Sequence, residues 1–81
     1  EMLERLTLAL TDVSWTVHEI DALLYSFVQK EGTNFKSVAQ PLRLALIGKE
    51  SSPNIASVLH ILGKTETLNR ISDVLVNVKN D

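Results

Sequence analysis

Apolar residues recur every three to four positions along almost the whole chain, which is the spacing of amphipathic helices. In the first stretch they are Met2, Leu6, Ala9 and Leu10. The same spacing predicts further helices over residues 16–31, 38–47, 53–62 and 65–78. No segment alternates between apolar and polar residues with period two, as a half-buried strand would. We therefore expect an all-α fold, a compact bundle of about five short helices.

The residues between these stretches are typical of helix ends. Thr16 and Glu19 have the spacing of a capping box, in which two side chains satisfy free main-chain donors at a helix start. Trp15 and Ile20 are placed to pack on each other beside that start as a hydrophobic staple. Glycine is the usual residue just after a helix, and three glycines are expected to end helices here: Gly32, Gly48 and Gly63.

The starts of the later helices depend on proline and hydroxyl residues. Residues 32–37 are polar enough to predict a loop. Pro41 then fits a helix only in its first turn, where the missing N–H costs nothing. For the fourth helix, Ser52 is the expected N-cap and Pro53 the first helical residue. Thr65 is the expected cap of the fifth.

Composition limits the chain to one small domain, residues 1–81. The hydrophobic fraction of 44% is too high for a disordered chain. The absence of cysteine excludes a disulfide scaffold, a thiolate metal site and a cysteine nucleophile. No apolar run approaches the ~20 residues of a membrane span, so we expect no membrane partner. The chain opens on Glu1, without a basic leader, and we expect a fragment of a longer protein.

The charge is unevenly distributed although the net charge is only −2. Residues 1–31 hold two basic and six acidic residues, whereas residues 32–81 hold six basic and four acidic ones. The basic part weakly favours a nucleic-acid partner. The two histidines, His18 and His60, lie in different predicted helices, and no Gly-rich phosphate loop is present. We therefore expect no catalytic residue and no metal site in this chain.

The third predicted helix is apolar almost all round and should be central in the bundle. Nevertheless Gln40 and Arg43 share one of its faces, three residues apart. An isolated buried charge is costly, so the guanidinium needs a partner or an opening. Two interpretations stay open: a salt bridge to Glu50 or Asp73, or an arginine aimed at an external anion or base.

The fourth predicted helix begins only nine residues after Arg43. A helix start offers free N–H groups and the positive end of a dipole, which suit an anion or a base acceptor. The two features could line one shallow site. The alternative is an ordinary Ser-Pro helix start.

Three motifs in order resemble the closing stretch of bacterial glutamyl-tRNA synthetases. They are Gln-Pro-Leu-Arg-Leu-Ala-Leu-Ile-Gly at residues 40–48, Ser-Pro-Asn-Ile at 52–55 and Leu-Gly-Lys-Thr-Glu-Thr-Leu-Asn-Arg-Ile at 62–71. Trp15-Thr16 is similar to the Trp-Thr helix start of that family. The resemblance covers residues 13–76. It departs from the family at Ile47, where threonine is usual, and at Asn54, where glycine is usual; the second makes a close main-chain approach to a base less secure.

The resemblance implies a helical-cage domain that holds the anticodon loop of tRNA. The family's anticodon contacts fall on Arg43, Ser52, Pro53 and Ile55, and we add Gln40 from the same helix face. Single-stranded RNA is read by stacking and by hydrogen bonds to base edges. Phosphate attraction positions the RNA without specifying its sequence, and we assign it to Lys36, Lys49 and Lys64.

The resemblance also implies a parent enzyme that attaches glutamate to tRNA, with ATP and magnesium held in a catalytic part absent from this chain. The fragment itself would need no cofactor. We expect a monomeric, cytoplasmic protein. The residues do not indicate whether the parent also charges the glutamine tRNA.

Two rival functions remain. The fourth and fifth helices meet at Gly63, as in a helix-turn-helix DNA-binding unit, but Glu66 and Asp73 on the would-be recognition helix, residues 65–78, would repel phosphates. A helical protein-interaction module, such as an acyl carrier, would fit the size and acidity. The chain lacks the Asp-Ser-Leu attachment site that a carrier needs.

Overall fold

Five helices form the described part of the chain in the computed structural model, which describes residues 2–49 and 54–79. Residues 2–49 and 54–79 contain no strand, which confirms the predicted all-α bundle. The bounds are α1 Met2–Thr11, α2 Val17–Glu31, α3 Phe35–Ile47, α4 Ile55–Leu62 and α5 Lys64–Lys79.

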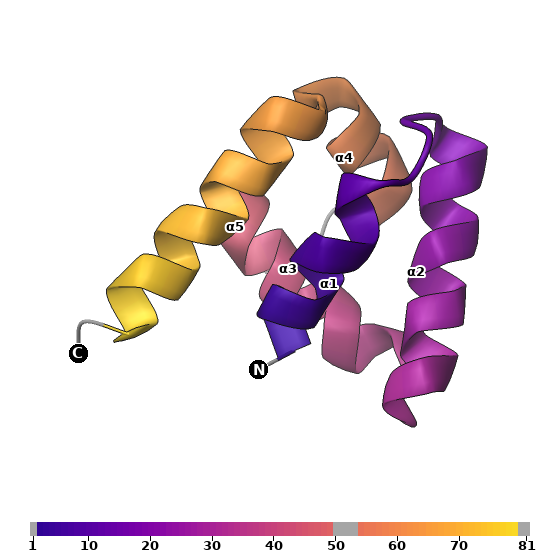
Figure 1. Ribbon diagram of the computed structural model, residues 1–81, viewed down its shortest axis with the longest axis horizontal. Helices are drawn as coiled ribbons and strands as arrows, with labels where there is room; N and C mark the ends of the chain where they lie inside the picture. The colour runs from indigo at the N-terminus through magenta and orange to yellow at the C-terminus, as the bar shows by residue number, and fades with distance from the viewer. Residues whose placement is uncertain (1, 50–53, 80–81) are drawn as a thin grey trace.

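The helices wrap around one another instead of running as a parallel bundle (Figure 1). In the view of Figure 1, α1 crosses in front of α3, α2 stands at the right, and α4 and α5 close the top and the left. α2 packs chiefly against α4, α3 packs against α5, and α1 contacts both α2 and α5. The C-terminal end of α5 extends away from the other helices. None of the helices in the described ranges combines the length and apolar character needed to cross a bilayer.

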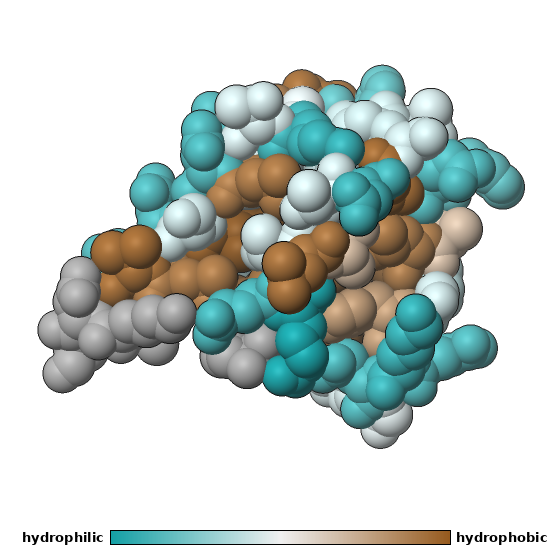
Figure 2. Space-filling view, viewed as in Figure 1, coloured by the Kyte–Doolittle hydropathy of each residue, from teal (hydrophilic) through white to brown (hydrophobic). Residues whose placement is uncertain are grey.

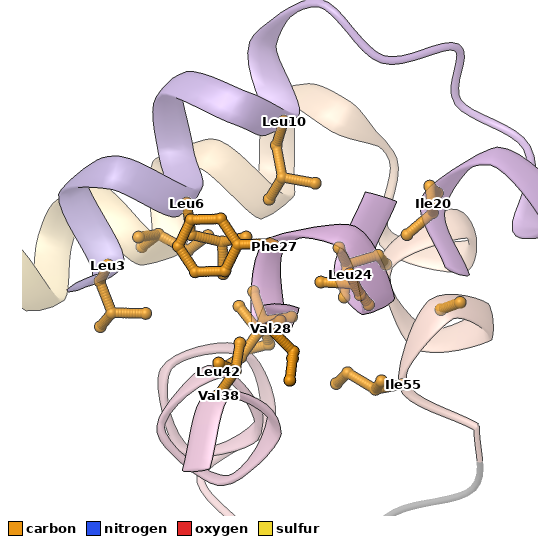
Figure 3. Packing of buried hydrophobic residues seen from close by; sticks show 14 residues of the cluster. Leu3, Leu6, Leu10, Ile20, Leu24, Phe27, Val28, Val38, Leu42 and Ile55 are labelled. Carbon is orange, nitrogen blue, oxygen red and sulfur yellow. The ribbon is translucent and has the colours of Figure 1, made fainter. Parts of the chain in front are cut away.

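The core receives apolar side chains from all five helices. In Figure 3, side chains from α1, α2, α3 and α4 point toward one another around Leu24 and Phe27. Burying a large aliphatic side chain stabilises a fold by about 1.5–3 kcal/mol, so these contacts are the main force that holds the helices together. The fully buried large side chains are Leu6, Leu10, Ile20, Leu24, Val38, Leu42, Leu46, Ile55, Leu59, Thr67 and Ile71.

The predicted ends of α2 are confirmed. The Thr16 hydroxyl accepts a hydrogen bond from the main-chain N–H of Glu19 at 3.1 Å. The N–H of Thr16 donates to the carbonyl of Ser14 at 2.9 Å, so this donor has a main-chain acceptor in place of the Glu19 carboxylate. Gly32 ends the helix in the left-handed conformation, at φ 66°, which glycine adopts without strain.

The start of α3 differs from the prediction. The helix begins at Phe35 because Asn34 caps it, accepting the N–H of Ser37 at 2.8 Å. Residues 35–37 are therefore helical and not a loop. Pro41 consequently lies in the helix interior, where it deprives the carbonyl of Ser37 of its usual N–H partner. Ser37 is exposed, so water can reach that carbonyl, which explains why the proline is tolerated. Gly48 ends α3 as predicted.

The starts of α4 and α5 also differ. Asn54, not Ser52, is the N-cap of α4, and it accepts the N–H of Ala56 at 2.9 Å. Ser52 and Pro53 lie outside the described residues. Gly63 ends α4 as predicted, but α5 follows at once and Thr65 is already helical. The carbonyl of Gly63 accepts the N–H of Thr67 at 3.0 Å, so the glycine serves both helices and no separate threonine cap is needed.

Candidate nucleic-acid interface

α3 has one buried side and one solvent-facing side. Its buried residues are Val38, Ala39, Leu42 and Leu46. Residues 36, 40, 43 and 47 follow one another at helical spacing along the other side, because successive residues turn by 100°. We call this set, Lys36, Gln40, Arg43 and Ile47, the α3 stripe. Leu44 beside it is 47% exposed. The prediction of a helix surrounded by the bundle is therefore wrong.

Gln40 and Arg43 are both half-buried on the α3 stripe, one turn apart. The ion pairs within residues 2–49 and 54–79 join Arg5 to Glu31 and Arg70 to Glu66. Asp73 belongs to neither of these pairs, and Arg43 itself already takes part in an interaction within the protein. Glu50, the other salt-bridge partner considered above, lies outside the described residues. Arg43 is half-buried on this side of α3, so part of the residue is still open to an external group.

The start of α4 offers less to a ligand than its sequence indicates. The side chain and the carbonyl of Asn54 already accept hydrogen bonds from Ala56, Ser57 and Val58. The side chain of Ile55 is only 2% exposed and points into the core near Leu24 (Figure 3). A contact from Ile55 to an external base would therefore have to come from its main chain.

The three predicted phosphate contacts lie in different surroundings. Lys36 and Lys49 are exposed and lie at opposite ends of α3, Lys36 in its first turn and Lys49 two residues after its last residue. Lys64 is half-buried, and its ammonium donates to the carbonyl of Thr11 at 2.8 Å. The same ammonium lies 5.6 Å from the ring centroid of Trp15, within cation–π range. Lys64 thus joins the end of α1 to the start of α5, whereas the other two lysines project into solvent.

Arg70 is a residue whose role the sequence analysis missed. Its Nη1 donates to the main-chain carbonyl of Leu46, in the last turn of α3. Its Nε donates to the carboxylate of Glu66 at 2.8 Å. The four-residue spacing of Glu66 and Arg70 is a readable signal for the ion pair, but nothing local indicates the contact with α3. Arg70 holds the C-terminal end of α3 against α5 and so fixes the orientation of the α3 stripe.

A separate groove of about 640 Å³ lies between α1 and α2. Its floor includes Ala9, Leu23 and Phe27. A bidentate pair closes one part of it: Arg5 Nε and Nη2 donate to the two carboxylate oxygens of Glu31 at 2.8 and 2.6 Å. This hydrogen bonding, more than the charge of Arg5, holds the pKa of Glu31 below its usual value.

The space-filling view in Figure 2 shows α1 and α5 from the same side as Figure 1. Apolar side chains gather over these two helices and along the projecting part of α5, and hydrophilic side chains surround them. Leu8 of α1 is 73% exposed. Apolar side chains offer no charge to a phosphate, so the α3 stripe remains the better candidate for a nucleic-acid interface.

The sequence profile of the anticodon binding domain family matches residues 1–75. The chain belongs to this family. The family match therefore agrees with the resemblance inferred from residues 13–76 and gives no support to the helix-turn-helix alternative.

Curated relatives carry the name glutamate–tRNA ligase. Ligase 1 of Bartonella henselae is 49% identical over 63 residues, which are 78% of this chain and 13% of the relative. The ligase of Rhodopseudomonas palustris strain TIE-1 is 43% identical over 74 residues, 90% of this chain and 16% of the relative. Ligase 2 of Bartonella quintana is 47% identical over 64 residues, 79% of this chain and 14% of the relative. The anticodon-binding chain thus spans about one-seventh of these relatives. No solved structure matches it at a significant level.

Proposed function

We propose that this chain recognises the anticodon loop of tRNA as the C-terminal domain of a glutamate–tRNA ligase. The observation that carries the proposal is the position of Arg43, half-buried on the solvent side of α3, in a chain of the anticodon-binding family. Two further features support it: Gln40 lies one turn away on the same stripe, and Arg70 anchors the end of α3.

The proposed mechanism uses the planar guanidinium in two ways. Anticodon bases splay out of the loop, stack on side chains and present their edges for hydrogen bonding. Arg43 can stack through its flat face and donate through its N–H groups, which a lysine does not reproduce. Gln40 adds an amide that both donates and accepts. Ser52 and Pro53 stay part of this proposal as contacts near the start of α4, together with the main chain of Ile55.

Lysines would strengthen binding without choosing a sequence. Lys36 and Lys49 project from the two ends of α3, so each can approach a different phosphate of the loop. Lys64 would contribute to the same field from the start of α5. These contacts weaken with salt because binding releases counterions from the RNA.

The parent enzyme would join glutamate to its tRNA, using ATP and magnesium in its catalytic part. We propose that it acts as a monomer in the cytoplasm, where translation takes place. The chain itself would supply recognition only. Incubating the purified 81-residue chain with glutamate, ATP, magnesium and tRNA should give no glutamyl-tRNA; product above the blank would overturn this assignment.

The decisive experiment compares Arg43→Ala with the unmodified chain for two tRNAs, the glutamate tRNA and the same molecule with a substituted anticodon. Removing a base-edge contact should reduce the discrimination between them by roughly 1–3 kcal/mol. Arg5→Ala is the matched control, because it removes the same charge from α1 and leaves the α3 stripe intact. Thermal melts accompany each titration. A destabilised Arg43→Ala variant that keeps the affinity ratio would show that Arg43 is structural and that the site is wrong.

A further inference from the structure

Two aromatic rings stack at the surface where α2 meets the start of α3. The ring centroids of Tyr25 and Phe35 lie 4.8 Å apart, and the ring planes are inclined by 25°. Tyr25 is nevertheless 54% exposed. The two other aromatic residues have structural roles. Phe27 is buried in the core, and Trp15 donates a hydrogen bond to the carbonyl of Leu59. The core therefore does not account for Tyr25.

The position of Tyr25 on α2 separates it from the groove beside α1. The α2 residues that line that groove are Glu19, Ala22, Leu23, Ser26, Phe27, Lys30 and Glu31. Tyr25 is absent from this lining and turns toward α3, where it meets Phe35. Phe35 is the first residue of α3 and is followed directly by Lys36, the first member of the α3 stripe. The aromatic pair therefore lies at the N-terminal end of α3, about 12 Å along the helix axis from Arg43 and roughly 80° around it, at 1.5 Å and 100° per residue.

We propose that Tyr25, backed by Phe35, is a stacking platform for an unpaired base of the RNA loop that the α3 stripe binds. This inference rests on the proposed function and extends its surface onto α2. One face of the tyrosine ring packs on Phe35, which restrains its orientation, while much of the residue stays open to solvent. An open aromatic face of this kind stacks on any base, since every base has a π-face.

One cation follows Phe35 directly in the chain, and one carboxylate, that of Asp21, lies one turn before Tyr25 on α2. Lys36 is exposed and adjacent to Phe35 in the chain, so its ammonium can meet the phosphate next to a base that stacks on Tyr25. Stacking is tolerant of sequence, whereas the guanidinium of Arg43 reads base edges. The platform thus adds affinity without selectivity, a signature that separates its effect from that of Arg43.

The test is a titration of the 81-residue chain with the glutamate tRNA and with its anticodon-substituted form. Tyr25→Leu keeps an apolar contact with Phe35 but removes the aromatic face, and should weaken both tRNAs by the same factor, about 5-fold to 150-fold. Tyr25→Phe keeps the ring and should bind within about twofold of the unmodified chain. Equal affinity of Tyr25→Leu and the unmodified chain would overturn the platform.

The variants also separate this inference from the function on which it rests. A changed affinity ratio in Arg43→Ala together with unchanged binding by Tyr25→Leu rejects the platform alone. Unchanged binding by both variants rejects the whole α3 surface as the site. If Tyr25→Leu does not fold, Tyr25→Trp in a Trp15→Phe background provides a second measurement. Its single indole fluorescence should be quenched by saturating tRNA, and constant emission would reject the proposal.

Discussion

The indole Nε1 of Trp15 donates a hydrogen bond to the main-chain carbonyl of Leu59 at 3.0 Å, across 44 positions of the sequence. The same carbonyl accepts the N–H of Gly63 at 3.0 Å and the hydroxyl of Thr67 at 3.4 Å. One oxygen atom thus joins the segment before α2, the last turn of α4 and the first turns of α5. Trp15 also packs against the core cluster that contains Ile20, so its ring contacts the core while its polar atom binds a distant helix.

Replacing Trp15 by phenylalanine tests this link. The substitution keeps an aromatic ring and removes the N–H donor, and it should cost about 1 kcal/mol of unfolding free energy. The measurement is a urea titration followed by circular dichroism. Tyr25→Phe, which removes a polar group from an exposed ring, is the control and should leave the midpoint unchanged. An unaltered midpoint for Trp15→Phe would show that the hydrogen bond adds nothing to stability.

The N-caps provide a second prediction. Thr16→Ala and Asn34→Ala each remove the oxygen that accepts a first-turn N–H, and each should cost about 1 kcal/mol. Thr33→Ala is the control, since the hydrogen bond of Thr33 within residues 2–49 and 54–79 is made by its main-chain N–H, with the carbonyl of Val28, and the substitution keeps it. Binding of tRNA, corrected for the folded fraction, should be unaffected by Thr16→Ala. A stable Thr16→Ala variant without tRNA binding would instead place this residue in the RNA interface.

Much of the fold follows from the sequence because capping and amphipathic spacing act over a few residues. For that reason Thr16 caps the start of α2 as predicted, and Gly32 and Gly48 end α2 and α3 as predicted. The start of α3 was harder to predict, because the polar run after Gly32 hides the cap at Asn34, and Pro41 argues for a later start. At α4 the Ser-Pro pair indicated a cap at Ser52, whereas the N-cap in the structure is Asn54, two residues later.

The candidate site could be predicted only in part. That Gln40 and Arg43 share one side of α3 follows from the helical period alone. The burial of Ile55 depends on how α2 packs against α4. The hydrogen bond from Lys64 to the carbonyl of Thr11 depends on where α1 ends. Neither relation has a local signal. The contact of Arg70 with the end of α3 is of the same kind, since its acceptor is a main-chain oxygen 24 residues away.

The Arg5–Glu31 pair predicts a pH dependence of stability. Hydrogen bonding to Arg5 lowers the pKa of Glu31 from an ordinary value of 4.5. A carboxylate whose pKa is lower in the folded state stabilises the fold above its unfolded pKa, and this contribution disappears as the pH falls through the folded pKa. The melting temperature of the unmodified chain should therefore fall more steeply below about pH 4.5 than that of Glu31→Gln.

Thermal melts over a series of acidic buffers provide this comparison. Glu19→Gln, which neutralises an exposed carboxylate of the same helix, should follow the unmodified chain closely. Salt at ~1 M should reduce the difference between the two profiles, because screening weakens exposed charge pairs. Parallel profiles for Glu31→Gln and the unmodified chain at low salt would mean that the pair does not stabilise the fold in solution.

The lysines give the last prediction, in which salt dependence distinguishes a phosphate contact from a structural one. Lys36→Ala and Lys49→Ala should each weaken all tRNAs alike and reduce the slope of log affinity against log salt by about 1. Lys64→Ala should act differently, because its ammonium already bonds the Thr11 carbonyl and lies over Trp15. It should lower the unfolding free energy by about 1 kcal/mol and change the salt slope less than the other two. Titrations at four salt concentrations, with a urea titration of each variant, measure both quantities. If Lys64→Ala keeps full stability and loses as much slope as Lys49→Ala, the ammonium leaves Thr11 to meet the RNA, and Lys64 belongs to the interface in the same sense as the other two.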